Sequence, residues 1–238
     1  MPRIPLIDDL TKDPIPPGSN ILVEFDPASQ WYNASLSIAG GWLKDGGIVE
    51  YGTSVQSVAK IRSKMRRFDL DVDALERDGK LELWDWYTVT LGRKSDEKLS
   101  IDSMKVADLS IKWATGFPFT RVSELPEQSE RLGIRDNAST LARFNDEKAW
   151  VEFEVTRIIP VWAAHKSVGF RGVVKGVHSE WVYKRLEDAY DGIVDFKLEE
   201  IGEETRDLIR IRSMRDIGFD RKWHRLKVGE NFEITFEN

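Results

Sequence analysis

Residues 18–46 read GSNILVEFDPASQWYNASLSIAGGWLKDG, and this stretch decides the fold. Ile21, Leu22 and Val23 form a short apolar run that is typical of a buried strand in a parallel sheet. From about Ser29 onward, apolar residues recur mostly on one side of a helix, and the Gly46-Gly47 pair predicts where that helix ends. The order of strand, loop and helix is that of a phosphate-binding loop.

The residues that would hold phosphate in such a loop are missing. A working loop follows the pattern G-x-x-x-x-G-K-[ST], in which backbone N–H groups surround the phosphates, the lysine reaches them and the hydroxyl holds Mg²⁺. The corresponding positions here are Phe25, Gln30, Trp31 and Tyr32. We therefore predict a loop that keeps the frame of a phosphate site without its ligands, with aromatic side chains filling the pocket.

The segments around this loop carry a resemblance to a known family. They are LIDDL (6–10), IPPGSNILV (15–23), LKDGGIVEY (43–51), LDVDAL (70–75), GKLEL (79–83), GVHSE (176–180), DGIVDF (191–196) and RIRSMR (210–215). In this order and spacing the chain resembles the KaiC/RadA branch of the RecA-type ATPases along nearly its whole length. The resemblance implies an α/β fold, a RecA-like three-layer sandwich with a mostly parallel central sheet and a C-terminal antiparallel hairpin, as one domain spanning residues 1–238.

The resemblance also assigns the family's catalytic positions to residues of this chain. The phosphate-contacting lysine falls on Trp31, the Mg²⁺ hydroxyl on Tyr32, and the acidic pair that activates water falls near Ser54 and Val55. The Walker B aspartate falls on Asp136, in a segment that is polar and short for a buried strand. The degenerate nucleotide pocket would comprise Phe25, Asp26, Ser29, Gln30, Trp31, Tyr32 and Asp136.

The chain thus lacks the family's lysine, metal-binding hydroxyl and water-activating acids. Their absence predicts a pseudo-ATPase, because phosphoryl transfer depends on positioning and electrostatic stabilisation. The basic pair that in related rings reaches the neighbouring nucleotide falls on Ser213 and Arg215, so Arg215 is a candidate trans finger. We expect a binding or regulatory subunit without a cofactor, whose partner is a protein such as an active RecA/KaiC-family ATPase. Self-association is the simplest alternative. A nucleotide-binding protein or weakly active ATPase with a non-standard phosphate loop, or an unrelated α/β protein, remains open.

Basic residues leave a single-stranded DNA-binding role as a further alternative. The predicted helix of residues 54–68 carries Lys60, Lys64 and Arg67, and a later group includes Arg212, Arg221 and Trp223. Charge interleaved with an aromatic residue is typical of single-strand binders. The formal net charge of −6 argues against a dedicated nucleic-acid protein and favours a solvated surface or a protein interface. Among the nine tryptophans, Trp84, Trp86 and Trp223 have polar neighbours, and we expect them to be exposed contact residues.

Composition predicts an ordinary cytoplasmic protein. The 238 residues include no cysteine, which excludes disulfides and thiolate metal sites, and no apolar run is long enough to span a membrane. The histidines His165, His178 and His224 lack the spacing of a metal site and are expected on surfaces or loops. No sequence motif supports a nucleophilic hydrolase.

The remaining elements are predicted more coarsely. Residues 92–130 are expected to form irregular, insertion-like structure. Asn145 or Asp146 should cap an apolar helix that Pro160 kinks or ends. A strand at residues 170–177 should then lead into a helix at residues 180–190.

Overall fold

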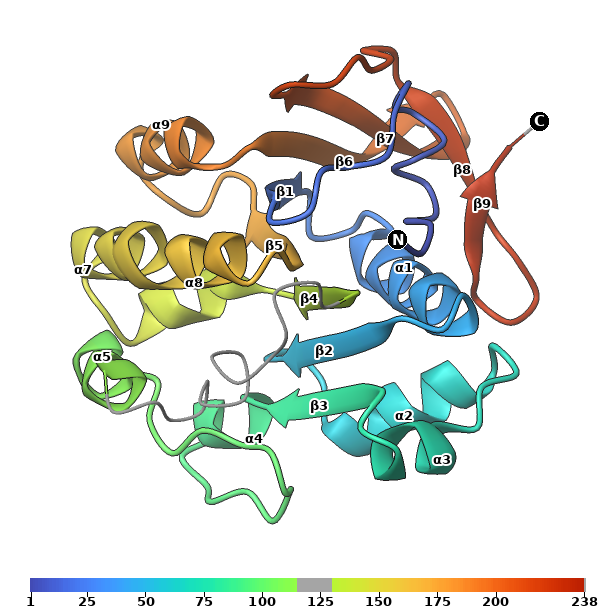
Figure 1. The fold of residues 1–238 in the computed structure, drawn as a ribbon. Coiled ribbons are helices and arrows are strands. Elements are labelled where there is room, and N and C mark those ends of the chain that lie inside the picture. The colour runs from blue at the N-terminus through green and yellow to red at the C-terminus, as the bar shows by residue number, and fades with distance from the viewer. Residues whose placement is uncertain (115–129, 238) are drawn as a thin grey trace.

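The computed structural model describes residues 1–114 and 130–237, and the strands of this part of the chain form one mixed sheet (Figure 1). Their order is β3-β2-β4-β5-β1-β6-β7-β8-β9. Neighbours from β3 to β6 run parallel, and those from β6 to β9 run antiparallel. The strands are β1 (Asn20–Phe25), β2 (Ile48–Thr53), β3 (Leu81–Asp85), β4 (Arg131–Arg135), β5 (Val168–Val174), β6 (Gly192–Ile201), β7 (Glu204–Met214), β8 (His224–Val228) and β9 (Ile234–Phe236).

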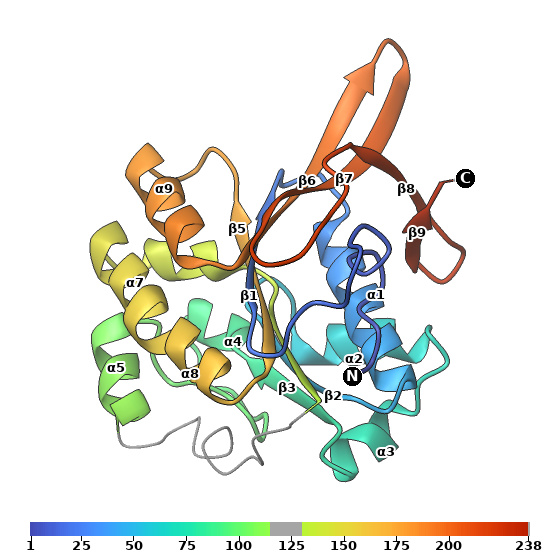
Figure 2. The ribbon, with the colours of Figure 1, turned by 45° about the horizontal axis from the view of Figure 1, so that its top comes forward.

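Helices cover both faces of the sheet and complete a three-layer arrangement. One face carries α1, α2 and α3, and the opposite face carries α5, α7, α8 and α9 (Figures 1 and 2). The helices are α1 (Trp31–Lys44), α2 (Val58–Arg66), α3 (Val72–Arg77), α4 (Tyr87–Thr90), α5 (Val106–Ala114), α7 (Glu147–Phe153), α8 (Ile159–Ala164) and α9 (Glu180–Ala189). A 3₁₀ helix (Ala138–Arg143) follows β4, and a π-helical turn (Glu154–Ile158) joins α7 to α8. The expected mostly parallel α/β sandwich is confirmed.

The expected C-terminal antiparallel hairpin is formed by β6 and β7. It extends past the body of the sheet, as Figure 2 shows. The inner part of β6 is buried, whereas its outer end near Ile201 and the facing start of β7 are exposed. Glu200, Glu203 and Glu204 of this region are exposed to solvent.

β4 lies in the middle of the sheet although its sequence, RLGIR, is short and polar. All five of its residues are buried. The Arg135 guanidinium lies 3.0 Å from the centre of the Trp86 ring. Gly133 leaves room for Trp162, whose ring would come within 2.1 Å of a Cβ at this position. A polar strand can lie at the sheet centre here because Trp162 fills the space over Gly133 and the Trp86 ring lies against the Arg135 guanidinium.

Charged side chains cross the sheet face beneath α7, α8 and α9 in a continuous row. The row comprises Glu82, Glu50, Arg131, Arg135, Arg171, Glu24, Asp195, Arg210 and Arg212. Arg131 donates to Glu82 at 2.8 Å, and Arg210 donates to Asp195 at 2.8 Å. Burial raises the pKa of Glu50 to about 7. Burial likewise raises the pKa of Glu24 to about 7, against the lowering effect of Arg212.

Several predicted boundaries shift. The helix expected at residues 54–68 begins only at Val58, because the Ser57 hydroxyl caps it by accepting from the Lys60 amide at 3.3 Å. Asp146, rather than Asn145, caps α7. The side chain of Asn145 instead accepts from the Val106 amide and donates to two carbonyls.

The predictions for the middle of the chain are tested only in part. The strand expected at residues 170–177 occupies Val168–Val174, and the following helix is α9. Residues 92–130 include α5, while 115–129 lie outside the described part of the chain. No helix among the described residues is both long and apolar enough to cross a membrane.

Candidate functional site

The predicted pocket residues meet where the parallel strands end. The loop after β1 (26–30), the start of α1 and the residues following β2 and β4 all lie at the carboxyl edge of the sheet. Ligands of open α/β sheets bind at this edge. The structure therefore places Asp136, which follows β4, beside the loop after β1.

Trp31 points into the protein at this edge. Its side chain is fully buried, and its indole Nε1 donates to the main-chain oxygen of Asp136 at 2.7 Å. Its ring centre lies 5.4 Å from that of Phe196 and 6.2 Å from that of Phe25. A Cβ at Gly172 would lie 2.4 Å from the indole nitrogen and 2.3 Å from the same carbonyl oxygen. Gly172 therefore provides the space in which Trp31 meets this carbonyl.

Tyr32, the next residue, is also held by contacts within the protein. Its hydroxyl accepts from the Asn137 amide at 3.0 Å, and its ring meets Phe25 edge-on at 5.2 Å. Burial, and to a smaller extent the charge of Asp136, raises the pKa of the Tyr32 phenol to about 12. The phenol is therefore neutral at physiological pH, and its hydroxyl is hydrogen-bonded to Asn137 of the same chain.

The loop itself folds back as a turn. The amide and hydroxyl of Ser29 both donate to the carbonyl oxygen of Asp26, at 2.9 and 2.7 Å. The Asp26 amide donates to the Phe196 carbonyl at 3.0 Å, and the Gln30 side chain accepts from Asn33 at 2.8 Å. These polar groups of the loop thus have partners within the protein.

Asp136 is fully buried and hydrogen-bonded to the end of β2. Its carboxylate accepts from the Thr53 hydroxyl at 2.8 Å, from the Ser54 amide at 3.0 Å and from the Ser54 hydroxyl at 3.1 Å. Burial raises its pKa, and these hydrogen bonds oppose the rise. Ser54, at a position where the resemblance implies a water-activating acid, is a donor to this carboxylate. Val55 lies next to it in the loop before α2.

Two basic residues of the expected nucleic-acid patch lie at the open side of this loop. Lys60 and Lys64 line a cavity of about 460 Å³ together with Ser29, Gln30 and Tyr32. Burial lowers the pKa of Lys64, whose Nζ lies 3.5 Å from the side-chain oxygen of Asn33. Arg67 is not among the residues that line this cavity; its guanidinium lies 5.0 Å from the ring centre of Phe232.

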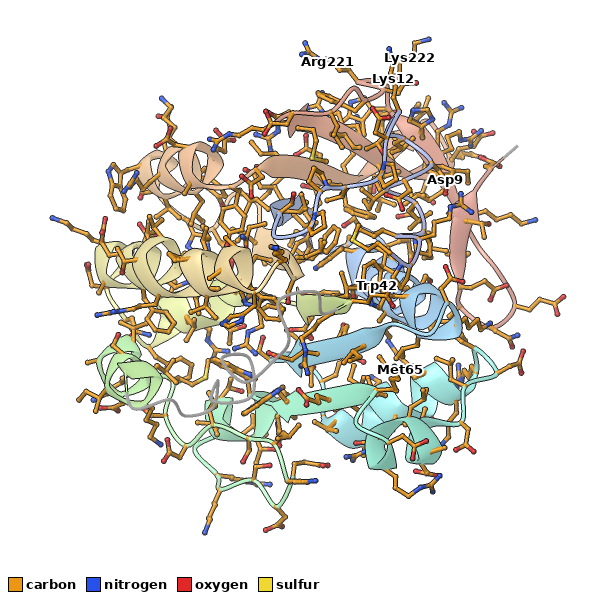
Figure 3. The ribbon with its side chains drawn as sticks, in the orientation of Figure 1. Asp9, Lys12, Trp42, Met65, Arg221 and Lys222 are labelled. Atoms are coloured by element: carbon orange, nitrogen blue, oxygen red, sulfur yellow. The ribbon has the colours of Figure 1, made fainter. Side chains whose placement is uncertain are left out.

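The second basic group is largely engaged within the protein. Arg212 donates to Asp195 at 2.6 Å and to Glu24 at 2.5 Å. Trp223 is half-buried, with Lys197 and Arg210 each 4.4 Å from its ring centre. Arg221 extends outward from the molecule (Figure 3).

Arg215 is exposed just after β7 and donates to the Asp188 carbonyl. Ser213, the other member of the predicted finger pair, is half-buried in β7.

Two expectations about exposure are wrong. Trp84 and Trp86 are buried rather than exposed contact residues. Their polar neighbour Asp85 is buried too, because it accepts from the Thr88 amide at 3.0 Å and the Ser95 hydroxyl at 2.6 Å. A polar residue next to these tryptophans in sequence therefore did not indicate that the tryptophans are exposed to solvent.

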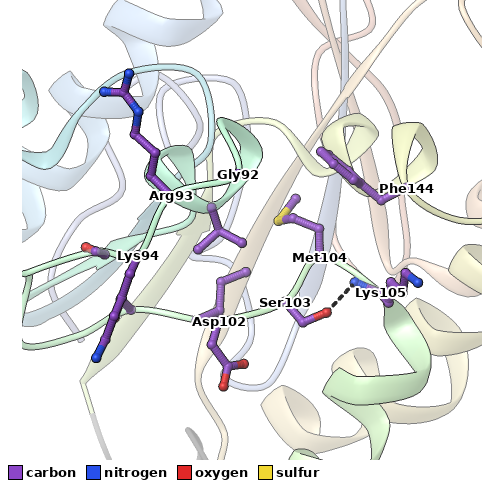
Figure 4. Close-up of a pocket in the computed structure, with 12 residues that line it drawn as sticks. Gly92, Arg93, Lys94, Asp102, Ser103, Met104, Lys105 and Phe144 are labelled. Atoms are coloured by element: carbon purple, nitrogen blue, oxygen red, sulfur yellow. Dashed lines mark hydrogen bonds between the residues drawn. The ribbon is translucent and has the colours of Figure 1, made fainter.

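His178 lies in the loop after β5, as expected, but its side chain is buried rather than at the surface. Its side chain is only 4% exposed and makes hydrogen-bond contacts with Ser139 and Glu147. No sequence spacing indicates this group, because its members come from the 3₁₀ helix, α7 and the loop after β5. They line a cavity of about 560 Å³ at the same edge of the sheet. A further hollow of about 540 Å³, bordered by Arg93, Lys94 and other residues drawn in Figure 4, contains no predicted site residue.

Comparison with known proteins supports the fold. The chain is similar to the crystal structure of the KaiC-like protein PH0186 from the hyperthermophilic archaeon Pyrococcus horikoshii OT3, with a TM-score of 0.73 and 16% sequence identity. The match covers 99% of this chain and 96% of that one. No model of a protein family matches the sequence, and no curated protein matches it. The chain has the RecA-like, KaiC-like fold that its sequence predicts, and likeness at this identity shows the fold alone.

Proposed function

We propose that this KaiC-like domain has no ATPase activity and acts as a binding or regulatory subunit through protein contacts. The observation that carries the proposal is the burial of Trp31, whose indole is bonded to Asp136 where a phosphate-binding lysine would stand. A lysine reaches outward to phosphate, whereas this indole fills the interior. A bound nucleotide would lack the lysine cation that normally contacts its phosphates, and so would the transition state of phosphoryl transfer.

The neighbouring groups support the same conclusion. Tyr32 replaces the metal-binding hydroxyl and is hydrogen-bonded to Asn137. Asp136 accepts three hydrogen bonds from Thr53 and Ser54, so its carboxylate already has protein donors. Binding Mg²⁺ there would require breaking buried hydrogen bonds, each costing about 1–3 kcal/mol if its groups stay unsatisfied.

An exposed arginine gives the domain a way to act on a partner. RecA-type domains assemble side by side, and Arg215 is exposed just after β7. In this proposal the guanidinium approaches the nucleotide of a neighbouring active ATPase, in which charge on the transferring phosphoryl group needs a cation.

The first test is isothermal titration with Mg·ATP and Mg·ADP, with thermal-shift scans alongside. We expect no heat and no shift at millimolar nucleotide. The second test measures the ATPase rate of an active KaiC-family protein from the same organism with and without this chain. Arg215→Ala should abolish the effect, whereas Arg221→Ala, which also removes an exposed arginine, should preserve it. Micromolar nucleotide affinity would refute the proposal.

A second candidate function has one specific observation in its favour. Lys60 and Lys64 of α2 line the cavity beside the loop after β1, so a nucleotide could receive its cations from α2 instead of from the loop. The same titration separates the two functions. Affinity that falls at least about tenfold in Lys64→Ala would favour this candidate, since a charge-assisted hydrogen bond is worth about 1.5–3 kcal/mol.

A further inference from the structure

Three side chains from different structural elements form a linear hydrogen-bonded chain. The Ser139 Oγ lies 2.8 Å from Nε2 of His178, and Nδ1 of the same ring lies 3.1 Å from Oε1 of Glu147. A hydroxyl, an imidazole and a carboxylate connected in this order form the arrangement that activates a serine nucleophile.

The hydrogen-bond partners fix where the protons lie. The Ser179 hydroxyl, at 2.6 Å, is the main cause of a lowered pKa of Glu147, so this carboxylate is ionised near neutral pH. Burial lowers the pKa of His178, against the raising effect of Glu147. A neutral ring beside an ionised acceptor carries its proton on Nδ1. Nε2 is then free to accept the proton of Ser139.

The surrounding residues hold the imidazole in place. Its ring centre lies 4.9 Å from that of Trp150 and 5.9 Å from that of Tyr183. The Tyr183 hydroxyl donates to the Val174 carbonyl at 2.7 Å and accepts from the His178 amide at 3.3 Å. Both the ring and the backbone that carries it are therefore fixed before any ligand arrives, as a general base requires.

A cavity gives a ligand access to the serine. Ser139 is 7% exposed and, with His178, lines the space of about 560 Å³ described above. Leu91 and Val177, which also line it, are exposed apolar residues, and Arg143 adds a cation to the wall. An apolar lining with a few polar groups suits a small uncharged or monoanionic molecule with a short acyl chain.

We propose that Ser139, His178 and Glu147 form an acyl-transfer site that hydrolyses small carboxylic esters. Oγ of Ser139 attacks the ester carbon while its proton passes to Nε2 of His178. The bond to the alcohol oxygen then breaks, and the alcohol leaves with that proton. Water next attacks the acyl-serine, its proton passes to Nε2, and the acid leaves as the proton returns to Ser139. The sum is ester plus water giving acid plus alcohol, independent of nucleotide.

The competing explanation is that the chain of hydrogen bonds only joins structural elements. The Ser139 hydroxyl also accepts from the Val174 amide at 2.9 Å, linking the 3₁₀ helix to β5. A hydroxyl with one donor bond and one acceptor bond retains a lone pair, so it can attack as well as connect. The two roles predict different reactivities of the Ser139 hydroxyl, and this reactivity is what must be measured.

The first experiment treats the full chain with a fluorophosphonate probe and locates the adduct by mass spectrometry. We expect one adduct, on Ser139, that is absent in Ser139→Ala and forms about 100-fold or more slowly in His178→Gln, the typical contribution of a general base. Thr90→Ala removes another hydroxyl that lines the cavity and donates to the Tyr87 carbonyl. It should label like the parent. Circular dichroism establishes that each variant is folded. No adduct, or an adduct elsewhere, would overturn the proposal.

A second variant keeps the test decisive if Ser139→Ala unfolds. The chain has no cysteine, so Ser139→Cys introduces its only thiol. An imidazole-paired thiolate should react with iodoacetamide below pH 7, at least about tenfold faster than in the Ser139→Cys, His178→Gln double variant. A thiol that reacts with the ordinary pKa of about 8.5 in both would show that His178 does not activate this position.

Discussion

Replacing Trp31 with alanine tests whether its indole holds the carboxyl edge of the sheet together. The side chain is fully buried, and truncation of a buried tryptophan costs about 3–5 kcal/mol. The lost bond to the Asp136 carbonyl adds about 1 kcal/mol. We therefore expect the free energy of unfolding to fall by about 4–6 kcal/mol. For a chain of this length that corresponds to a decrease in Tm of roughly 10–20 °C.

Urea unfolding followed by circular dichroism measures this loss. Trp181→Ala is the matched control, because this tryptophan of α9 is 45% exposed and its removal should change stability by less than about 0.5 kcal/mol. The cavity in Trp31→Ala should also bind free indole, which at ten times its Kd would restore about 1.4 kcal/mol. Indole should leave the parent unchanged.

A small loss would refute the reasoning. If Trp31→Ala costs less than about 1.5 kcal/mol, or no more than Trp181→Ala, the indole does not fill the site. The steric part of the proposed function would then fail with it. If Trp31→Ala is strongly destabilised and indole has no effect, the site collapses after truncation, and the packing argument still holds.

Three further predictions concern the same framework. Gly172→Ala should cost about 1–3 kcal/mol in urea unfolding, and adding Trp31→Ala should not rescue it, because the Asp136 carbonyl remains 2.3 Å from the new Cβ. Burial raises the pKa of Glu50 from 4.5 to about 7, so its contribution to stability is present below pH 4.5 and lost as the pH rises to 7. Glu50→Gln should weaken this decline by about 1 kcal/mol or more between pH 4.5 and 7.5; an unchanged slope would contradict the assignment. Asp146→Ala should cost about 1 kcal/mol through loss of the α7 cap, and a thermal melt indistinguishable from the parent would exclude that role.

Local patterns predicted the fold well where one segment carries its own signal. The run from Ile21 to Val23 and the periodic residues after Ser29 became β1 and α1. β4 was harder to predict, because its burial depends on partners such as Trp86 and Trp162 that belong to other segments. Tertiary partners of this kind leave no local pattern.

The candidate site likewise contains some residues that the sequence predicted and others that it could not. The position of Trp31 was predicted from the strand, loop and helix of residues 18–46, and that of Asp136 from the family resemblance; the structure brings the two residues together. The contacts of Ser139 and Glu147 with His178 could not be predicted, since residues 8 to 39 positions apart meet only when three elements converge. Sequence reveals a site when a motif is local, and misses it when the site is assembled by the fold.

The row of charges across the sheet bears on how the chain selects this strand order from its alternatives. β4 must insert between β2 and β5, although the strand that precedes it in sequence is β3 and not β2. In the native order Arg131 meets Glu82 and Arg210 meets Asp195. A one-residue slip would turn these side chains to the other face. A buried charge deprived of its partner costs about 3–5 kcal/mol. The charges thus act against misassembly, since a wrongly ordered or shifted sheet would be penalised at several strands at once.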